Sequence, residues 1–114
     1  MSASRDARRV VVQARLVEPG PIPTPESILP YRNALVVNAY DVVTAIDGNY
    51  GASRILVAQW AIRDGQILPD ARKETGAEYA LVVELYDAHP ELEGERLIQQ
   101  SDDPTLPLYY DVGN

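Results

Sequence analysis

Between Arg54 and Leu68 the sequence reads RILVAQWAIRDGQIL, a long apolar run that contains the only tryptophan of the chain. Successive side chains of a strand point to opposite faces. One face of this strand would carry Leu56, Ala58, Trp60 and Ile62. The opposite face is also mostly apolar, which is typical of a strand that is covered on both sides. Asp64-Gly65 predicts a two-residue hairpin turn, because both residues tolerate the positive φ that such a turn requires.

Trp60 has two interpretations. Three apolar neighbours on its own face favour core packing, in which case the indole N–H needs an acceptor. The alternative is a stacking platform for a sugar ring or a base. We expect a core residue on a central strand.

Other segments also have strand character. Residues 8–18 alternate well, and they place Val10, Val12, Ala14 and Leu16 on one face. Ala34–Ile46 is the longest candidate and is apolar on both faces near its start. Residues 66–68 would be the short partner of the hairpin, residues 79–87 a clear strand and residues 96–100 a weak one. Residues 106–112 would close the chain as an edge strand.

These segments predict an all-β fold, a small antiparallel barrel or sandwich of five to six strands. An OB-like barrel is the leading shape. No helix is long enough for a crossover between parallel strands. The alternative is a small immunoglobulin-like sandwich, which would need about seven strands.

The chain has 114 residues, of which 46% are apolar, and this is enough for one domain with a buried core. We expect a single β domain over residues 1–114, with residues 1–8 flexible and residues 19–33 as a proline-rich connection. Thr24 and Pro25 predict one helical turn within this connection, capped by Thr24.

Charge and composition limit the partners. The net charge is −7, spread unevenly: residues 1–63 carry about +2 and residues 64–114 about −9. The acidic half would repel phosphates, so we expect no nucleic-acid partner. No apolar run reaches the length of a membrane span, so we expect no membrane insertion. The absence of cysteine excludes disulfides and thiolate metal sites.

Tyrosines are the candidate ligand-binding residues. Tyr109 and Tyr110 should point to opposite faces of their strand, and Tyr50 lies in a glycine-rich turn where we expect it to be exposed. Aromatic rings near carboxylates suit a carbohydrate site, because sugar faces stack on rings and carboxylates accept hydrogen bonds from hydroxyls. The alternative is that tyrosine is simply a common strand residue.

No residue pattern indicates catalysis, a metal or a cofactor. His89 is the only histidine, and Asp87 and Glu91 flank it in a loop. This spacing differs from that of a calcium-binding loop, so we expect a solvated loop and no metal site. The sequence contains neither the pattern of a catalytic triad nor a phosphate-binding glycine loop.

Four segments together resemble a known kind of domain. They are YRNALVVNAYDVV, DGNYGASRILVAQWAIRDGQIL, EYALVVELYDAHPELEGERL and DDPTLPLYYDV, within residues 31–112. They are similar to C-terminal β-domains of bacterial envelope proteins, of the kind attached to SGNH-type enzymes that acetylate exopolysaccharides. The resemblance implies an accessory role, an envelope or secreted location, and no catalytic residues to transfer.

Two functions follow as hypotheses. The first is a non-catalytic module that binds a polysaccharide or a partner envelope protein. The second is a purely structural domain that positions an attached enzyme and has no ligand of its own. A shared exposed groove lined by Tyr50, Trp60, Tyr109 or Tyr110 would favour the first.

Overall fold

The computed structural model describes residues 9–48, 50–99 and 106–113. Within these ranges the chain forms seven strands and four short 3₁₀ turns. The strands are β1 (Val10–Glu18), β2 (Ala34–Asp47), β3 (Arg54–Arg63), β4 (Gln66–Ile67), β5 (Glu78–Leu85), β6 (Arg96–Ile98) and β7 (Leu108–Asp111). The 3₁₀ turns are η2 (Glu26–Ile28), η3 (Pro69–Ala71), η4 (Tyr86–Ala88) and η5 (Pro90–Leu92). The segment expected to be flexible, residues 1–8, lies outside the described residues.

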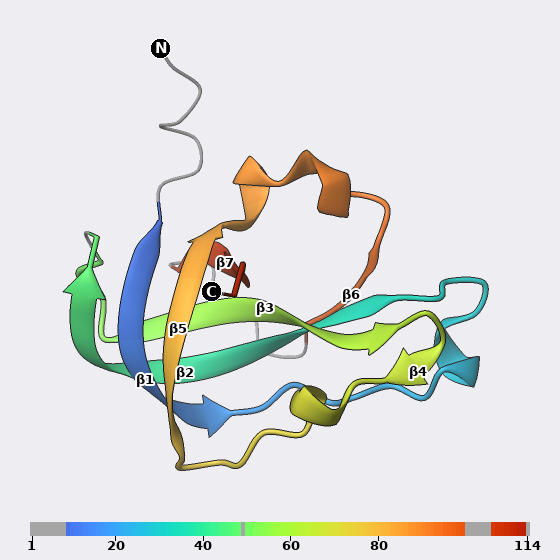
Figure 1. Cartoon of the computed structure of the whole chain (residues 1–114), viewed down its shortest axis with the longest axis horizontal. Coiled ribbons are helices and arrows are strands. Elements are labelled where there is room, and N and C mark those ends of the chain that lie inside the picture. Colours follow the sequence, from blue (N-terminus) through green and yellow to red (C-terminus); the bar gives the residue numbers. More distant parts are fainter. Residues whose placement is uncertain (1–8, 49, 100–105, 114) are drawn as a thin grey trace.

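Five of the strands close into a barrel (Figure 1). β1 pairs with β2 and β5, β2 pairs with β3, and β7 joins β3 to β5. The β3–β7 pairing is parallel, whereas the other four pairings of the barrel are antiparallel. The predicted fold class, a small all-β barrel of the OB-like kind, is confirmed, and the immunoglobulin-like sandwich is not formed.

The position predicted for the last strand is wrong. β7 is not an edge strand but lies between β3 and β5, where it completes the barrel. The short strands β4 and β6 lie at the edges instead, and β6 runs parallel to the start of β2. A four-residue segment that follows a proline has the local character of an edge strand. The position of β7 between β3 and β5 depends on strands that are distant from it in the sequence, and local patterns do not report on them.

The alternating residues of β1 point into the barrel, as predicted. Val12, Ala14 and Leu16 are completely buried there. They pack against interior residues of the other four barrel strands, among them Tyr40, Val57, Val83 and Tyr109. Because one face of β1 is apolar from Val10 to Leu16 while the other also carries Gln13 and Arg15, its register is fixed by burial.

A second apolar cluster lies on the outer face of β2 and β3. It contains Leu35, Val37, Ala39, Leu56, Ala58 and Leu92. Leu92 belongs to η5, and the segment 86–98 runs from the end of β5 to β6 beside β2 (Figure 1). This segment therefore covers the outer face of the barrel at β2 and β3, which explains why both strands are apolar on two faces.

The predicted hairpin is present between β3 and β4. Asp64 has φ 56° and Gly65 has φ 77°, so both turn residues are in the left-handed region. The backbone N–H of Gly65 donates to the carbonyl of Arg32 at 2.8 Å. The Arg32 guanidinium in turn donates to the Asp64 carboxylate at 3.1 Å. The turn is thus tied to the end of the 19–33 connection.

The 19–33 connection is anchored to β2 at Gly20. A Cβ atom at Gly20 would lie 2.5 Å from the carbonyl oxygen of Val37, so only glycine allows this close approach. The Gly20 N–H donates to the side chain of Asn38 at 2.8 Å. Further along, the hydroxyl of Thr24 accepts a hydrogen bond from the Ser27 N–H at 3.2 Å, as expected for the predicted cap.

Candidate functional site

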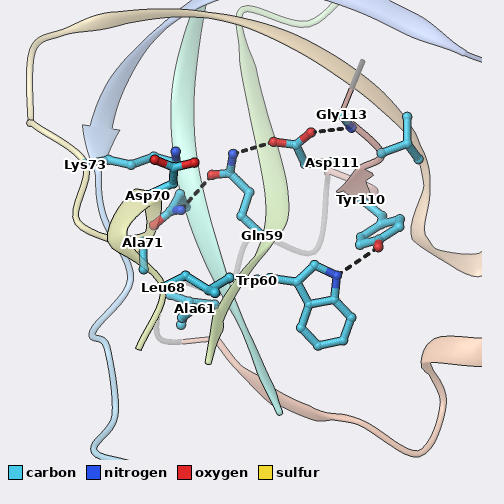
Figure 2. A pocket seen from close by; sticks show the side chains of 13 residues that line it. Gln59, Trp60, Ala61, Leu68, Asp70, Ala71, Lys73, Tyr110, Asp111 and Gly113 are labelled. Atoms are coloured by element: carbon cyan, nitrogen blue, oxygen red, sulfur yellow. Dashed lines mark hydrogen bonds between the residues drawn. The ribbon is translucent and has the colours of Figure 1, made fainter. Parts of the chain in front are cut away.

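A cavity of about 350 Å³ lies between β3 and the end of β7 (Figure 2). The backbone pairing of these two strands ends at Ala58 and Tyr110. Beyond that point the cavity is lined by the second half of β3, the start of β2, the chain around η3 and residues 110–113. The cavity therefore lies where the backbone pairing of β3 with β7 ends.

The floor of the cavity is a network of buried amide side chains. Asn38 and Gln59 are only 5% and 6% exposed. The Gln59 Oε1 accepts hydrogen bonds from Asn38 Nδ2 at 2.7 Å and from the Tyr40 hydroxyl at 2.5 Å. The Gln59 Nε2 donates to the carboxylate of Asp111 at 2.7 Å. Each side chain has a hydrogen-bond partner, as burial requires, and the Asn38 amide also contacts the Tyr40 oxygen. The Gln59 Nε2 carries a second N–H beyond the one that it donates to Asp111.

Burial raises the pKa of Tyr40 far above its ordinary value, although the hydrogen bond to Gln59 acts in the opposite direction. The Tyr40 hydroxyl therefore stays protonated and donates to Gln59 at neutral pH. Because this bond occupies the carbonyl of Gln59, the amide nitrogen of Gln59 is the group oriented toward Asp111.

Trp60 and Tyr110 form an aromatic wall of the cavity. The indole N–H of Trp60 donates to the Tyr110 hydroxyl at 2.9 Å, which is the acceptor that a packed indole requires. The Arg63 guanidinium lies over the Trp60 ring, 4.2 Å from its centroid. Trp60 packs against the outer cluster, but it is half-buried. The prediction of a core residue is thus correct for its packing face and wrong for its extent of burial.

Three charged side chains line the cavity: Asp70, Lys73 and Asp111. The two oxygens of Asp111 accept from Gln59 and, at 2.8 Å, from the Gly113 N–H. In the described part of the chain, none of the three charged groups is in a salt bridge. Figure 2 shows Asp70 and Lys73 on the opposite side of Gln59 from Trp60 and Tyr110.

The structure places the predicted tyrosines at two different sites. Tyr109 and Tyr110 do point to opposite faces of their strand. Tyr110 lines the cavity, whereas Tyr109 is buried inside the barrel. The Tyr50 ring packs edge-on against Tyr109, with ring centroids 5.5 Å apart. Tyr50 was expected to be exposed, and this is wrong, because it is half-buried against the barrel interior.

Burial, reinforced by the neighbouring Tyr109, raises the pKa of Tyr50 to about 12. The Tyr50 hydroxyl donates to the backbone carbonyl of Arg54. Tyr50 and Tyr109 therefore belong to the packing of the barrel, whereas the cavity is lined by Trp60 and Tyr110.

His89 lies in an ion-pair cluster rather than in a solvated loop. Its Nε2 is 2.8 Å from the buried carboxylate of Glu84, and its Nδ1 is 2.8 Å from Glu91. The Arg9 guanidinium contacts the second oxygen of Glu84 at 3.0 Å. The imidazole ring also packs against Tyr110, with centroids 4.9 Å apart. His89 thus connects the segment 86–98 to β5 and to the outer side of β7.

Burial alone would lower the pKa of His89, but its hydrogen bonds to Glu91 and Glu84 outweigh this effect and raise the pKa above the ordinary value. The same contact lowers the pKa of Glu91. Only the imidazolium form can donate from both ring nitrogens, so the two carboxylates favour the charged form.

The polar floor of the cavity is not among the features predicted from the sequence. Asn38 and Gln59 are isolated polar residues within apolar strands, and that is the signal that could have identified a buried hydrogen-bond pair. Nothing local indicated that Asp111 would meet Gln59, because 52 positions separate the two residues.

Within residues 9–48, 50–99 and 106–113, no three or more His, Cys, Asp or Glu side chains are arranged so that they could hold a metal ion. In the same ranges, no helix has the length and apolar character needed to span a membrane. Comparisons with family models, curated proteins and solved structures gave no match to this chain.

Proposed function

We propose that this domain is a non-catalytic binding module that takes a sugar unit of a polysaccharide into the cavity beside β3 and β7. The observation that carries the proposal is the combination of an aromatic wall, Trp60 and Tyr110, with the polar floor of Gln59 and Asp111. Sugars present both an apolar ring face and an array of hydroxyl groups. A site for them needs stacking surface together with donors and acceptors.

The size of the cavity fits this role. Ligand sites typically enclose roughly 300–1,000 Å³, and about 350 Å³ is at the lower end of that range. The remaining lining includes apolar side chains such as Val36, Leu68 and Val112. A ligand of one or two sugar rings would fill the space, with the rest of a polymer outside it.

The covered outer face of the barrel supports this location. OB folds commonly bind oligonucleotides and oligosaccharides on the face of their second and third strands. Here that face is the outer side of β2 and β3, and the chain's own segment 86–98 packs on it. A ligand would therefore bind beside this face rather than on it. The expectation of no nucleic-acid partner stays a prediction.

The contacts of His89 support a binding role rather than catalysis. A general base needs a free ring nitrogen within reach of a nucleophile or a substrate. Both ring nitrogens of His89 are instead engaged by the carboxylates of Glu84 and Glu91. The only histidine of the chain is thereby part of the scaffold.

A purely structural domain that positions an attached enzyme is the second candidate. It is favoured by the internal use of the polar groups at the cavity: Gln59 bonds Asn38, Tyr40 and Asp111, and the indole N–H bonds Tyr110. The resemblance to accessory domains of envelope proteins fits both candidates. The envelope location stays a prediction.

The two candidates differ in the effect of Trp60→Ala. As a test, the protein is screened against immobilised neutral, N-acetylated and de-N-acetylated oligosaccharides, and hits are measured by calorimetry. We expect Trp60→Ala to weaken binding at least about tenfold, because stacking on an aromatic ring contributes on the order of 1–3 kcal/mol. Tyr31→Ala, which removes an exposed ring outside the cavity, serves as the matched control and should leave the affinity unchanged.

Stability is measured on the same variants. Trp60→Ala should lower the free energy of unfolding by about 2 kcal/mol, less than for a fully buried ring, because the indole is half-buried. No binding to any glycan, together with this loss of stability, would favour the structural candidate. Unchanged binding in a folded Trp60→Ala protein would contradict the proposed site.

A further inference from the structure

The charge of the cavity is set by few groups. The charged side chains that line it are Asp70, Lys73 and Asp111, with two carboxylates against one ammonium. Arg63 lies over the indole of Trp60 but does not line the cavity. The lining is therefore negative on balance, in a domain whose net charge is also negative.

Asp111 is a fixed carboxylate without a cationic partner among the described residues. Its two oxygens each accept one hydrogen bond from a neutral group, Gln59 Nε2 at 2.7 Å and the Gly113 N–H at 2.8 Å. A carboxylate has about four acceptor positions, so each oxygen can accept a further bond. Because Asp111 is half-buried, its charge is less screened than a surface charge would be.

Lys73 is not in a salt bridge with Asp111 in the part of the chain that the structure describes. Its ammonium group lies 5.1 Å from the ring centroid of Tyr79, which packs against the barrel interior. Figure 2 shows Lys73 across the cavity from the end of β7. The carboxylate is thus positioned by two neutral donors and is open to a cation supplied by the ligand.

We infer that the cavity selects a sugar that bears a free amine over the same sugar with a hydroxyl or an acetamide group at that carbon. The protonated amine would donate to Asp111, and the second amide proton of Gln59 would donate to a sugar oxygen. The sugar face would pack on the wall of Trp60 and Tyr110. This inference names the ligand class of the site and rests on the proposed function.

The test uses three β-1,4-linked tetrasaccharides that differ only at carbon 2 of each ring. They carry an amine (glucosamine), an acetamide (N-acetylglucosamine) or a hydroxyl (glucose). Binding of each to the full chain is measured by calorimetry at a pH at which the amine is protonated. We expect the glucosamine tetramer to bind about tenfold more tightly than the glucose tetramer, as a partly exposed charge-assisted hydrogen bond would produce.

Two variants test which carboxylate causes the preference for the amine. Asp111→Asn keeps the shape of the side chain and removes its charge, so it should abolish the preference for the amine over the hydroxyl. Asp70→Asn changes an exposed residue and should reduce the preference by about two- to threefold. If Asp111→Asn fails to fold, Asp70→Asn provides the measurement.

The outcomes separate this inference from the proposed function. Equal affinities for the glucosamine and glucose tetramers in the unmodified protein would overturn the inference and leave the binding function standing. A preference for the amine that is unchanged in the folded Asn variants would also overturn it. Absence of binding to all three tetramers would overturn it together with sugar binding at this cavity.

Discussion

Gln59 is the polar centre of an otherwise apolar strand. It lies on β3 between Ala58 and Trp60 and turns its amide into the barrel end, where Asn38, Tyr40 and Asp111 meet it. A buried amide is tolerated only when its bonds are made. One residue thus holds β2, β3 and β7 together at the point where the backbone pairing of β3 and β7 stops.

Replacing Gln59 by leucine should lower the free energy of unfolding by about 3 kcal/mol. The substitution removes a shared acceptor and leaves buried groups of Asn38 and Tyr40 without their partner, and each unmade bond costs about 1–3 kcal/mol. Urea denaturation followed by circular dichroism measures the change. Tyr40→Phe removes one hydroxyl and leaves the bonds of Gln59 to Asn38 and Asp111 in place, so it should cost only about 1 kcal/mol. Equal losses in the two variants would contradict the central role of Gln59.

At the scale of elements, the hairpin between β3 and β4 depends on one backbone conformation. Gly65 has φ 77°, a value that a β-branched residue adopts only with strain, and an added Cβ would lie 3.1 Å from the Arg32 guanidinium. Gly65→Val should therefore destabilise the domain by about 1 kcal/mol or more. Gly94→Val is the control, since open space surrounds Gly94. A denaturation midpoint of Gly65→Val equal to that of the control would count against this requirement.

The segment that contains η4 and η5 is fixed to the barrel by His89, which contacts the carboxylates of Glu84 and Glu91. The pKa of His89 is raised in the folded protein, above an unfolded value of about 6.5. Its contribution to stability is therefore complete below the unfolded pKa and is lost as the pH rises through the folded pKa. We expect the free energy of unfolding to fall between about pH 6 and the folded pKa. Urea denaturation at a series of pH values measures this.

His89→Gln is the matched variant for this prediction. Glutamine cannot carry the charge that both Glu84 and Glu91 favour, so the fall in stability across this pH range should disappear. Because the chain contains a single histidine, no other imidazole can produce the effect. A pH profile that is identical in the two proteins would show that the cluster does not titrate as inferred.

At the scale of the whole molecule, closure of the barrel depends on its shortest strand. β7 has four residues, yet it pairs with β3 on one side and with β5 on the other. Deleting residues 106–114 should open the barrel and abolish cooperative thermal unfolding. The deletion removes the pairings of β7 with β3 and β5, exposes the edges of both strands, and removes Tyr109 from the barrel interior. Adding an excess of a peptide with the sequence of residues 106–114 should restore the native spectrum. A truncated chain with an unchanged melting temperature would refute this dependence.

Most of the fold could be predicted from the sequence, whereas little of the candidate site could. The alternation in β1, the two apolar faces of β3 and the turn at Asp64-Gly65 depend on neighbours along the chain. Local patterns therefore identify these features. Trp60 and Tyr110 were both singled out, but their contact joins residues 50 positions apart. The sequence around Tyr50 predicts an exposed ring, because a glycine-rich turn carries no information on the Tyr109 ring that packs beside it.

By itself the sequence determined an all-β chain with its strands, its hairpin and its apolar faces, because side-chain period and turn chemistry act over a few residues. Only the tertiary structure decided that β7 is inserted between β3 and β5, that Gln59 meets Asp111, and that His89 joins Glu84 to Tyr110. These features depend on which strands become neighbours when the barrel closes. Closure is driven by burial of the apolar interior, which is formed by residues from all five barrel strands. The sequence of one segment therefore does not determine it.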